Sequence, residues 1–299
     1  MARLAEKCKE LGCEYRLQEP MRLHTSFKIG GPADIFLLPE RPEQIAALLP
    51  FAQELNIPLH LLGCGSNVLV SDAGIRGAVL AISGRLSKIE RLSPQKIFCA
   101  AGAGLMQLCR FAQSEGLGGL EFAYGIPGSV GGAIFMNAGA YGGEMKDILL
   151  SVSHITADGK LDTLYGDALK LSYRHSAYME NGCCILSAEF ALQQAEPDTI
   201  RAQMDELKKR RKEKQPLEYP SAGSTFKRPK GAYASALIDQ CGLKGLRIGD
   251  AVVSEKHAGF IINAGSASCA DVCALIDEVK QRVLSQTGIT LECEVRLLS

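Results

Sequence analysis

The sequence lacks an excess of charge of either sign, because 33 lysine and arginine residues balance 33 aspartate and glutamate residues. This balance gives no indication of binding to nucleic acid or to a membrane surface. The sequence also lacks an apolar stretch of about 18 or more residues free of glycine and charge, so no transmembrane helix is predicted. Residues Met1–Lys7 do not have the apolar core of a signal peptide. We therefore expect a cytoplasmic protein.

Paired-cysteine motifs are missing as well, although the chain contains 11 cysteines. No C-x-x-C occurs, and an odd number of cysteines argues against a complete disulfide framework. Cys269 and Cys273 are four residues apart on a predicted helix, but no histidine lies near them in the sequence. We therefore predict free thiols in a reducing cytosol and no metal site.

Glycine is concentrated in two loops. The stretch Gly125–Gly143 holds seven glycines and no charged side chain, and Gly63–Asn67 follows the apolar run Pro58–Leu62, which is typical of a buried strand. A residue without Cβ lets the backbone approach a ligand closely, and a run of N–H groups near a helix start binds anions such as a diphosphate. One such loop alone is more typical of a tight turn. Two in one chain favour a nucleotide cofactor held through its phosphates.

A third glycine segment looks like a dinucleotide-binding fingerprint but does not complete it. Gly102-x-Gly104 follows the predicted strand Lys96–Ala101 and opens a helix, yet Gln107 stands where the third glycine belongs. The surrounding elements are not repeated βαβ units either. The sequence therefore does not predict a Rossmann site.

Hydrophobic periodicity predicts an α+β fold, and 299 residues suggest about two domains. We place the domain boundary near residue 195, where Pro197 and Asp198 open a long helix. The prediction is a domain 1–194, with subdomains of about 1–83 and 84–194, and a C-terminal domain 195–299. The predicted helices are 2–12, 42–56, 104–115, 199–215, one from about 232, and a last one after the capping box Ser268-x-x-Asp271. An apolar face is predicted for this last helix, formed by Val272, Leu275, Ile276, Val279 and Val283. The predicted strands are 34–38, 58–62, 68–70, 77–82, 96–101, 148–156, 160–165, 184–192 and 290–298. Asp158-Gly159 is predicted to form a hairpin turn between 148–156 and 160–165.

The motifs together resemble one family, the UDP-N-acetylenolpyruvoylglucosamine reductases, which are flavoproteins of bacterial cell-wall synthesis. The order and spacing of the matching motifs over about Leu23–Leu298 make the combination specific, and the chain is similar to the shorter type, without an inserted tyrosine loop. The matches are G-x-G-S-N at Gly63–Asn67, I-P-G-S-V-G-G-A at Ile126–Ala133, N-A-G-A-Y-G at Asn137–Gly142, S-Y-R at Ser172–Arg174, A-G-S-x-F at Ala222–Phe226 and E-V-R at Glu294–Arg296.

The resemblance implies a two-subdomain FAD-binding fold of the vanillyl-alcohol-oxidase type with a C-terminal α+β substrate-binding domain. It implies non-covalent FAD, NADPH as hydride donor, a small-molecule UDP-sugar substrate and a monomer or weak oligomer. The reaction would reduce the enolpyruvyl ether of UDP-N-acetylglucosamine to UDP-N-acetylmuramate. The implied cofactor-binding residues are Gly63, Gly65, Ser66, Asn67, Ile126, Pro127, Gly128, Ser129, Gly131 and Gly132.

The catalytic residues of the family fall on Arg174, Ser224 and Glu294. Each residue type suits the chemistry, because a guanidinium stabilises charge on the substrate carboxylate, a hydroxyl can protonate a carbanion-like centre, and a carboxyl group can hold the enolic form. Without the resemblance, a surface arginine, a turn serine and a solvated strand glutamate would be the simpler interpretations. Glu292 has the same strand parity as Glu294, but the glutamate of the family directly precedes V-R.

Further contacts and departures concern single positions. Tyr173, Lys214 and Phe226 lie in or beside these motifs and are candidate substrate contacts. Most of the basic residues around Lys208–Lys214 are expected to face solvent. Cys64 stands where a third glycine is common, Arg228 where some members have asparagine, and Cys293 where proline is frequent.

Two alternatives stay open from the sequence. One is another FAD-dependent oxidoreductase of the same flavin fold that acts on a hydroxy acid or a sugar. The other is a non-catalytic nucleotide-binding protein that kept the fold.

Overall fold

The computed structural model describes residues 1–299, which form two compact units. Unit 1 comprises Met1–Leu17, Ile35–Cys64 and Gly77–Arg210, and unit 2 comprises Gln18–Asp34, Gly65–Arg76 and Arg211–Ser299. The chain thus passes repeatedly between the units. One of these passages lies between Cys64 and Gly65, inside the glycine loop Gly63–Asn67. The domain boundaries predicted at 83/84 and 194/195 concern which segments bind flavin and which bind substrate. These boundaries stay predictions.

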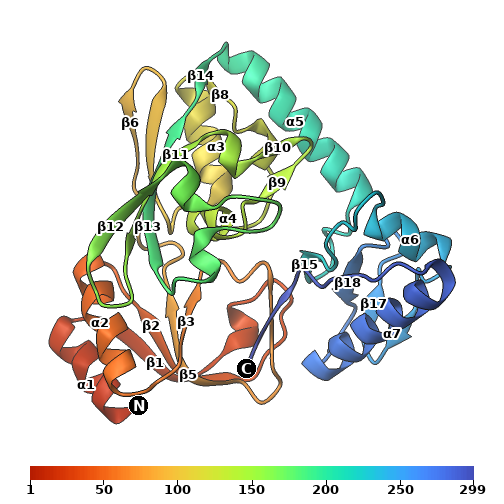
Figure 1. The fold of residues 1–299 in the computed structure, drawn as a ribbon, viewed down its shortest axis with the longest axis horizontal. Helices are drawn as coiled ribbons and strands as arrows, with labels where there is room; N and C mark the ends of the chain where they lie inside the picture. Colours follow the sequence, from red (N-terminus) through yellow and green to blue (C-terminus); the bar gives the residue numbers. More distant parts are fainter. The chain divides into compact units, whose positions relative to one another are not determined.

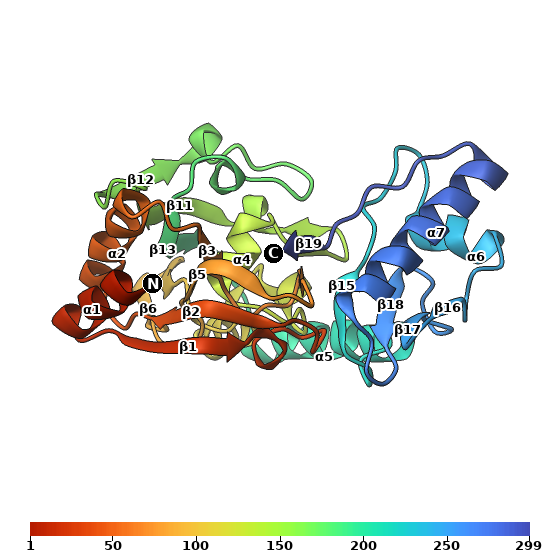
Figure 2. The same ribbon diagram turned by 90° about the horizontal axis from the view of Figure 1, so that it is seen from below.

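Unit 1 contains two large sheets, which differ in the direction of their strands (Figure 1), and two smaller two-stranded sheets. The first has the order β1-β2-β5-β3, and its β3 and β5 run parallel. Figure 2 shows helices α1 and α2 side by side at one end of this unit. The elements of this part are α1 (Ala2–Leu11), β1 (Glu14–Pro20), β2 (Pro32–Leu38), α2 (Pro42–Glu54), β3 (Leu59–Leu62) and β5 (Ile75–Ala81), of which β1, β2 and β5 have one end in unit 2.

The second sheet of unit 1 is antiparallel, with the order β12-β11-β13-β7-β6. Its strand β7 leads into helix α3, so the segment around Gly102 belongs to an antiparallel sheet and not to a Rossmann unit, as predicted. The elements are β6 (Ile89–Ser93), β7 (Lys96–Ala100), α3 (Leu105–Ser114), β8 (Leu117–Gly118), α4 (Val130–Phe135), β9 (Gly139–Ala140), β10 (Gly143–Glu144), β11 (Leu149–Ile155), β12 (Leu161–Tyr165), β13 (Cys184–Ala191), β14 (Gln193–Gln194) and α5 (Pro197–Lys214), of which α5 continues into unit 2.

Local sequence explains several boundaries in unit 1. Pro42 occupies the first turn of α2, where its missing N–H costs nothing, and the face with Ile45, Leu48 and Leu49 is buried. The turn between β11 and β12 is closed by a bond from the Thr156 N–H to the Lys160 carbonyl, and Gly159 has a φ of 87°. The predicted helix and hairpin are therefore confirmed.

Unit 2 has a four-stranded sheet, β15-β18-β17-β16, with helices α6 and α7 on one face (Figure 2). A separate parallel pair joins β4 to β19, the end of the chain. The elements are β4 (Val68–Val70), β15 (Ser221–Ser224), α6 (Ala234–Gln240), β16 (Arg247–Ile248), β17 (Ala251–Val253), β18 (Phe260–Asn263), α7 (Cys269–Thr287) and β19 (Arg296–Leu298).

The structure of helix α7 agrees with the two features predicted for it, a capping box and an apolar face. The Ser268 hydroxyl accepts a bond from the Asp271 N–H at 3.0 Å, and the Asp271 carboxylate accepts one from the Ser268 N–H at 2.9 Å. This is the predicted capping box. The apolar face predicted for the helix is buried in the core of unit 2, with Val272, Leu275, Ile276, Val279 and Val283 all less than a tenth exposed.

The prediction of one long terminal strand is wrong in its extent. The residues before β19 change neighbours instead of extending a single ladder. The N–H of Glu294 donates to the carbonyl of Thr225 at 2.8 Å, whereas the N–H of Arg296 donates to the carbonyl of Asn67 at 3.1 Å. The terminal segment therefore links the residues next to β15 with those before β4.

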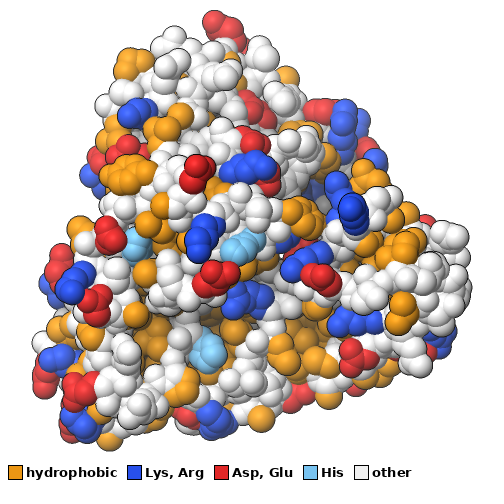
Figure 3. Space-filling view, in the orientation of Figure 1, with side chains coloured by type: hydrophobic (Ala, Val, Ile, Leu, Met, Phe, Trp, Pro, Cys, Tyr) orange, Lys and Arg blue, Asp and Glu red, His pale blue; other side chains and the backbone are white.

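The surface carries charges of both signs. Figure 3 shows lysine and arginine side chains interspersed with aspartate and glutamate over the face in view. No helix of the chain is both long enough and apolar enough to cross a membrane.

Candidate flavin and substrate site

The loop Gly63–Asn67 offers unbonded backbone donors. It connects β3 to β4, and none of the N–H groups of Gly63, Cys64, Gly65 and Ser66 donates to another group in the protein. Gly65 has a φ of 62°, and a Cβ atom there would lie 2.0 Å from the carbonyl oxygen of His24. Cys64, the departure from the family pattern, has no positive φ, so its Cβ is tolerated. Unbonded N–H groups on a glycine loop are what a bound phosphate requires.

Within unit 1 the glycine-rich stretch Gly125–Gly143, here called the second glycine loop, lies against Gly63, the start of the first glycine loop Gly63–Asn67. A Cβ atom on Gly63 would lie 2.4 Å from the Ser129 Oγ, which caps helix α4 by accepting a bond from the Gly132 N–H at 3.3 Å. The two loops that the sequence singled out therefore meet at Gly63 and Ser129. Their close contact depends on the missing side chain of Gly63.

Only some of the N–H groups in the second loop are available to a ligand. Those of Val130 and Gly131 donate to the carbonyls of Ala103 and Ala101, and that of Ile126 donates to Ala123. The N–H groups of Gly128 and Ser129 make no bond in the protein. A Cβ atom on Gly131 would lie 2.9 Å from the Ala101 Cβ, so this glycine allows α4 to pack against its neighbour. The sequence did not distinguish these packing glycines from the donors.

Unit 2 brings four distant segments together around β15. The Ser26 hydroxyl donates to the carbonyl of Ser221 at 2.6 Å, and the Ser26 N–H donates to the carbonyl of Gly65 at 3.1 Å. The Asn67 side chain donates to the carbonyl of Glu294 at 3.2 Å. These bonds fix residues 65–67, the A-G-S-x-F motif and the terminal E-V-R motif relative to one another within unit 2.

Ser224 stands at the end of β15, opposite Phe260 of β18. The preceding residue, Gly223, has a φ of 76° and allows the sharp bend before it. The Ser224 side chain is half-buried, and its hydroxyl makes no hydrogen bond within the protein. The hydroxyl is thus held on a strand and remains available to a ligand.

The two competing glutamates differ in their surroundings. Glu292 is exposed, and its carboxylate pairs with Lys227 at 3.2 Å, whereas Glu294 is half-buried. Glu294 is therefore the less solvated of the two carboxyl groups.

Arg174 occupies a strained position at the tip of a tight turn in unit 1. Ser172 and His175 exchange backbone bonds of 3.2 and 3.1 Å across the turn, and Arg174 has a φ of 54°. A residue with a Cβ pays about 1 kcal/mol for such a conformation, which is common at functional positions. The guanidinium donates to the carbonyl of Gly139 at 3.4 Å and lies 5.2 Å from the centre of the Tyr173 ring.

The three candidate substrate contacts are placed differently. Tyr173 is 48% exposed, and Lys214 is exposed at the end of α5. Phe226 is only 4% exposed and packs in the core of unit 2. Its side chain therefore has a packing role in this structure.

Sequence reasoning missed one buried cation. Arg211 is 7% exposed and donates to the Gln215 side chain at 3.3 Å, although the basic half of α5 was expected to be mostly solvated. The signal was the spacing of the buried residues Ile200, Met204 and Leu207, which continues onto Arg211. Arg228, the departure next to Phe226, stacks over the Tyr233 ring at 4.4 Å.

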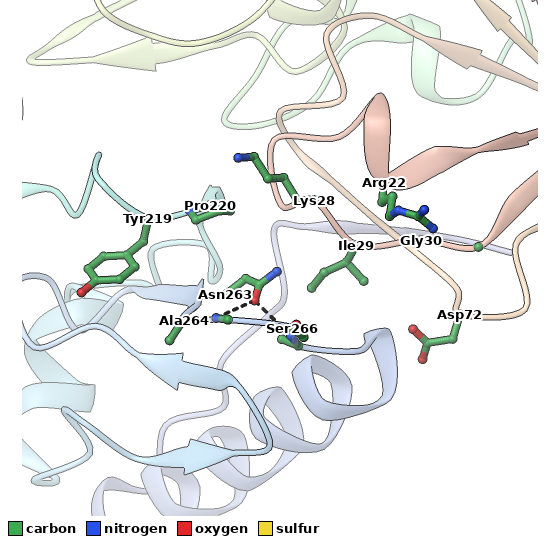
Figure 4. A pocket seen from close by; sticks show the side chains of 13 residues that line it. Arg22, Lys28, Ile29, Gly30, Asp72, Tyr219, Pro220, Asn263, Ala264 and Ser266 are labelled. Carbon is green, nitrogen blue, oxygen red and sulfur yellow. Dashed lines mark hydrogen bonds between the residues drawn. The ribbon is translucent and has the colours of Figure 1, made fainter.

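Unit 2 also contains a cavity of about 620 Å³, shown in Figure 4. Its wall includes Lys28, Asp72, Tyr219 and Asn263, but none of the predicted site residues. The Asn263 amide oxygen accepts bonds from the N–H groups of Gly265 and Ala267, so this side chain shapes the loop. No group of three or more histidine, cysteine, aspartate or glutamate side chains is arranged to hold a metal ion.

Comparisons with known proteins decide the family. Residues 33–165 match an FAD binding domain, and residues 215–298 match the UDP-N-acetylenolpyruvoylglucosamine reductase C-terminal domain. A reductase of that name from Agathobacter rectalis is 50% identical over 291 residues, which cover 94% of this chain and 92% of the relative. One from Syntrophomonas wolfei is 48% identical over 283 residues, covering 95% and 94%. The chain belongs to the UDP-N-acetylenolpyruvoylglucosamine reductase family.

A solved structure agrees with this family. The crystal structure of UDP-N-acetylenolpyruvylglucosamine reductase from Thermus caldophilus superposes with a TM-score of 0.81 at 34% identity, covering 96% of this chain and 99% of that one. The predicted FAD-binding fold with a C-terminal α+β domain is therefore confirmed, and the chain is an FAD-dependent oxidoreductase. The alternative of a different oxidoreductase of the same flavin fold is not favoured, because the C-terminal domain is also that of this family.

Proposed function

We propose that this protein reduces UDP-N-acetylglucosamine enolpyruvate to UDP-N-acetylmuramate with NADPH, in the synthesis of peptidoglycan precursors. The alkene of the enolpyruvyl ether gains one hydride, which comes from NADPH, and one proton, and the products are the lactyl ether and NADP⁺. The observation that carries the proposal is the 50% identity over 94% of the chain, which spans both the flavin and the C-terminal domain.

The residues of the two glycine loops fit the diphosphate of FAD. The N–H groups of Gly63–Ser66, Gly128 and Ser129 are the proposed donors, with Asn67, Ile126 and Pro127 beside them. Gly131 and Gly132 set the position of α4. This assignment is supported by unbonded N–H groups and by glycines whose Cβ atoms would clash. Bound FAD would supply the hydride-transfer chemistry between NADPH and the alkene of the substrate.

The side chains proposed to act on the substrate have separate tasks. Arg174 stabilises negative charge that develops on the substrate carboxylate as hydride arrives. Ser224 donates the proton to the inner carbon, a centre basic enough to take it from a hydroxyl. Glu294 holds the enolic carboxylate by a hydrogen bond. Tyr173 and Lys214 are proposed contacts of the UDP-sugar.

Arg174→Lys is expected to slow substrate reduction by about 10²-fold while binding changes much less, because an ammonium cannot pair with a carboxylate through two parallel bonds. The measurement is the rate at which substrate reoxidises the NADPH-reduced flavin in a stopped-flow experiment. Arg201→Lys, at a side chain that is 72% exposed, is the matched control. Unchanged turnover in the Arg174 variant would remove this residue from the proposed mechanism.

We also propose a cellular compartment and an oligomeric state for the protein. All 11 cysteines are free thiols, which fits a reducing cytoplasm. We propose a monomer or weak oligomer.

The function is tested by product analysis. The purified protein, incubated with NADPH and the enolpyruvyl substrate, should yield a product heavier by two hydrogens, with one NADPH consumed per product. NADPH consumption without this product would overturn the substrate assignment.

A further inference from the structure

Asn137 is completely buried at the end of helix α4. It follows the C-cap residue Met136, has a φ of 40°, and its own N–H donates to the Ile134 carbonyl at 3.0 Å. Glycine is the usual residue at such a left-handed position after a helix, because it has no Cβ. An asparagine at this position indicates that its side chain makes interactions that glycine could not make.

The side-chain amide of Asn137 makes three bonds. Its nitrogen donates to the Ser172 carbonyl and to the Glu144 carboxylate, both at 2.9 Å, and its oxygen accepts from the Lys146 N–H at 2.9 Å. A flipped amide would place its oxygen against two acceptors and its nitrogen against a donor. The three partners therefore fix the orientation of the group.

These bonds tie together the two segments that hold Arg174. The Ser172 carbonyl that accepts from Asn137 also closes the turn that carries Arg174. Glu144 pairs in the β10–β9 ladder with Gly139, whose carbonyl accepts from the Arg174 guanidinium. Asn137 thus contacts both the backbone that carries this arginine and the hairpin that its guanidinium contacts.

We propose that Asn137 is a positioning residue that fixes Arg174 relative to the loop around Gly128 and Ser129, which is proposed to bind the FAD diphosphate. Helix α4 begins at the Ser129 cap, in the proposed diphosphate loop, and ends at Asn137. The helix is only six residues long, so the cap and Asn137 lie close together in the chain. This inference rests on the role proposed for Arg174, and a displacement of that guanidinium by about 1 Å would slow the reaction up to about 10²-fold.

Asn137→Gly separates the side chain from the backbone conformation. Glycine adopts a φ of 40° without strain, so helix α4 keeps its end while the three amide bonds are lost. We expect the reoxidation of reduced flavin by substrate to slow at least about tenfold. Reduction of the flavin by NADPH should change less than about twofold, with flavin content retained. A variant that matches the wild type in both half-reactions would show that Asn137 only ends a helix.

A second pair of substitutions tests the bond to Ser172 if the glycine variant folds poorly. Asn137→Asp with Glu144→Gln exchanges donor and acceptor between these two side chains and retains an acceptor for the Lys146 N–H. It leaves the Ser172 carbonyl without its side-chain donor. The same selective slowing of reoxidation is expected, and wild-type reoxidation would contradict the proposal.

A double-variant cycle with Arg174→Lys shows whether Asn137 acts through this arginine. We expect Asn137→Gly to slow reoxidation at least about tenfold in the wild type but less than about twofold when Arg174 is already lysine. Equal slowing in both backgrounds would overturn the inference and leave the proposed function intact. An Arg174→Lys variant with wild-type turnover would instead overturn the role of Arg174 and, with it, this inference.

Discussion

Gly65→Ala is expected to yield a protein that does not retain FAD and therefore shows no detectable NADPH-dependent reduction. The new Cβ would lie 2.0 Å from the His24 carbonyl oxygen and 3.0 Å from the Thr25 Cα. Both are backbone atoms that cannot rotate away, so the loop must move. Its N–H groups would then no longer present the arrangement proposed to hold the diphosphate.

Gly12→Ala is the matched control for this loss. Gly12 has a φ of 61°, nearly that of Gly65, but a Cβ atom there would have no other atom within 4 Å. We expect this variant to lose about 1 kcal/mol of unfolding free energy and to keep its flavin. The measurement is the flavin-to-protein ratio after purification and after reconstitution with FAD. A Gly65→Ala protein with a full complement of FAD would refute the assignment of this loop.

Ser224→Ala is expected to slow the protonation of the substrate, and hence turnover, by about 10²–10⁴-fold, the usual range for loss of a positioned acid. Flavin reduction by NADPH should continue, because no proton has to reach the substrate in that step. Stability should change little, since the Ser224 hydroxyl makes no hydrogen bond within the protein.

Single-turnover kinetics separate the two half-reactions in the Ser224 variant. Ser221→Ala, on the same strand and also half-buried, is the control, because the bond from Ser26 reaches its backbone carbonyl and is kept in the variant. Turnover of Ser224→Ala within about threefold of the wild type would be far below the range for a lost acid and would remove this serine as the proton donor.

The sequence predicts best the features that local chemistry determines. The Ser268–Asp271 capping box, the Asp158-Gly159 turn and the apolar face of α7 each depend on residues a few positions apart, and all three appear in the structure. The two glycine loops can be predicted from the sequence for the same reason, since few residues can replace glycine at a left-handed φ.

The sequence cannot reveal features that depend on distant partners. Which N–H groups of the second loop stay unbonded depends on the carbonyls of Ala101 and Ala103, which lie in a different loop before helix α3. The terminal strand shortens because its residues meet first Thr225 and then Asn67. The burial of Asn137 depends on Ser172, which the fold alone brings within 2.9 Å.

The most direct test of the central claim is the visible absorption spectrum of the purified protein under anaerobic conditions. The spectrum is recorded first alone, then with NADPH, and then with UDP-N-acetylglucosamine enolpyruvate. The account predicts a yellow flavoprotein that NADPH bleaches and the enolpyruvyl substrate restores. A protein that stays bleached after the substrate is added, or one that remains colourless after reconstitution with FAD, would contradict it.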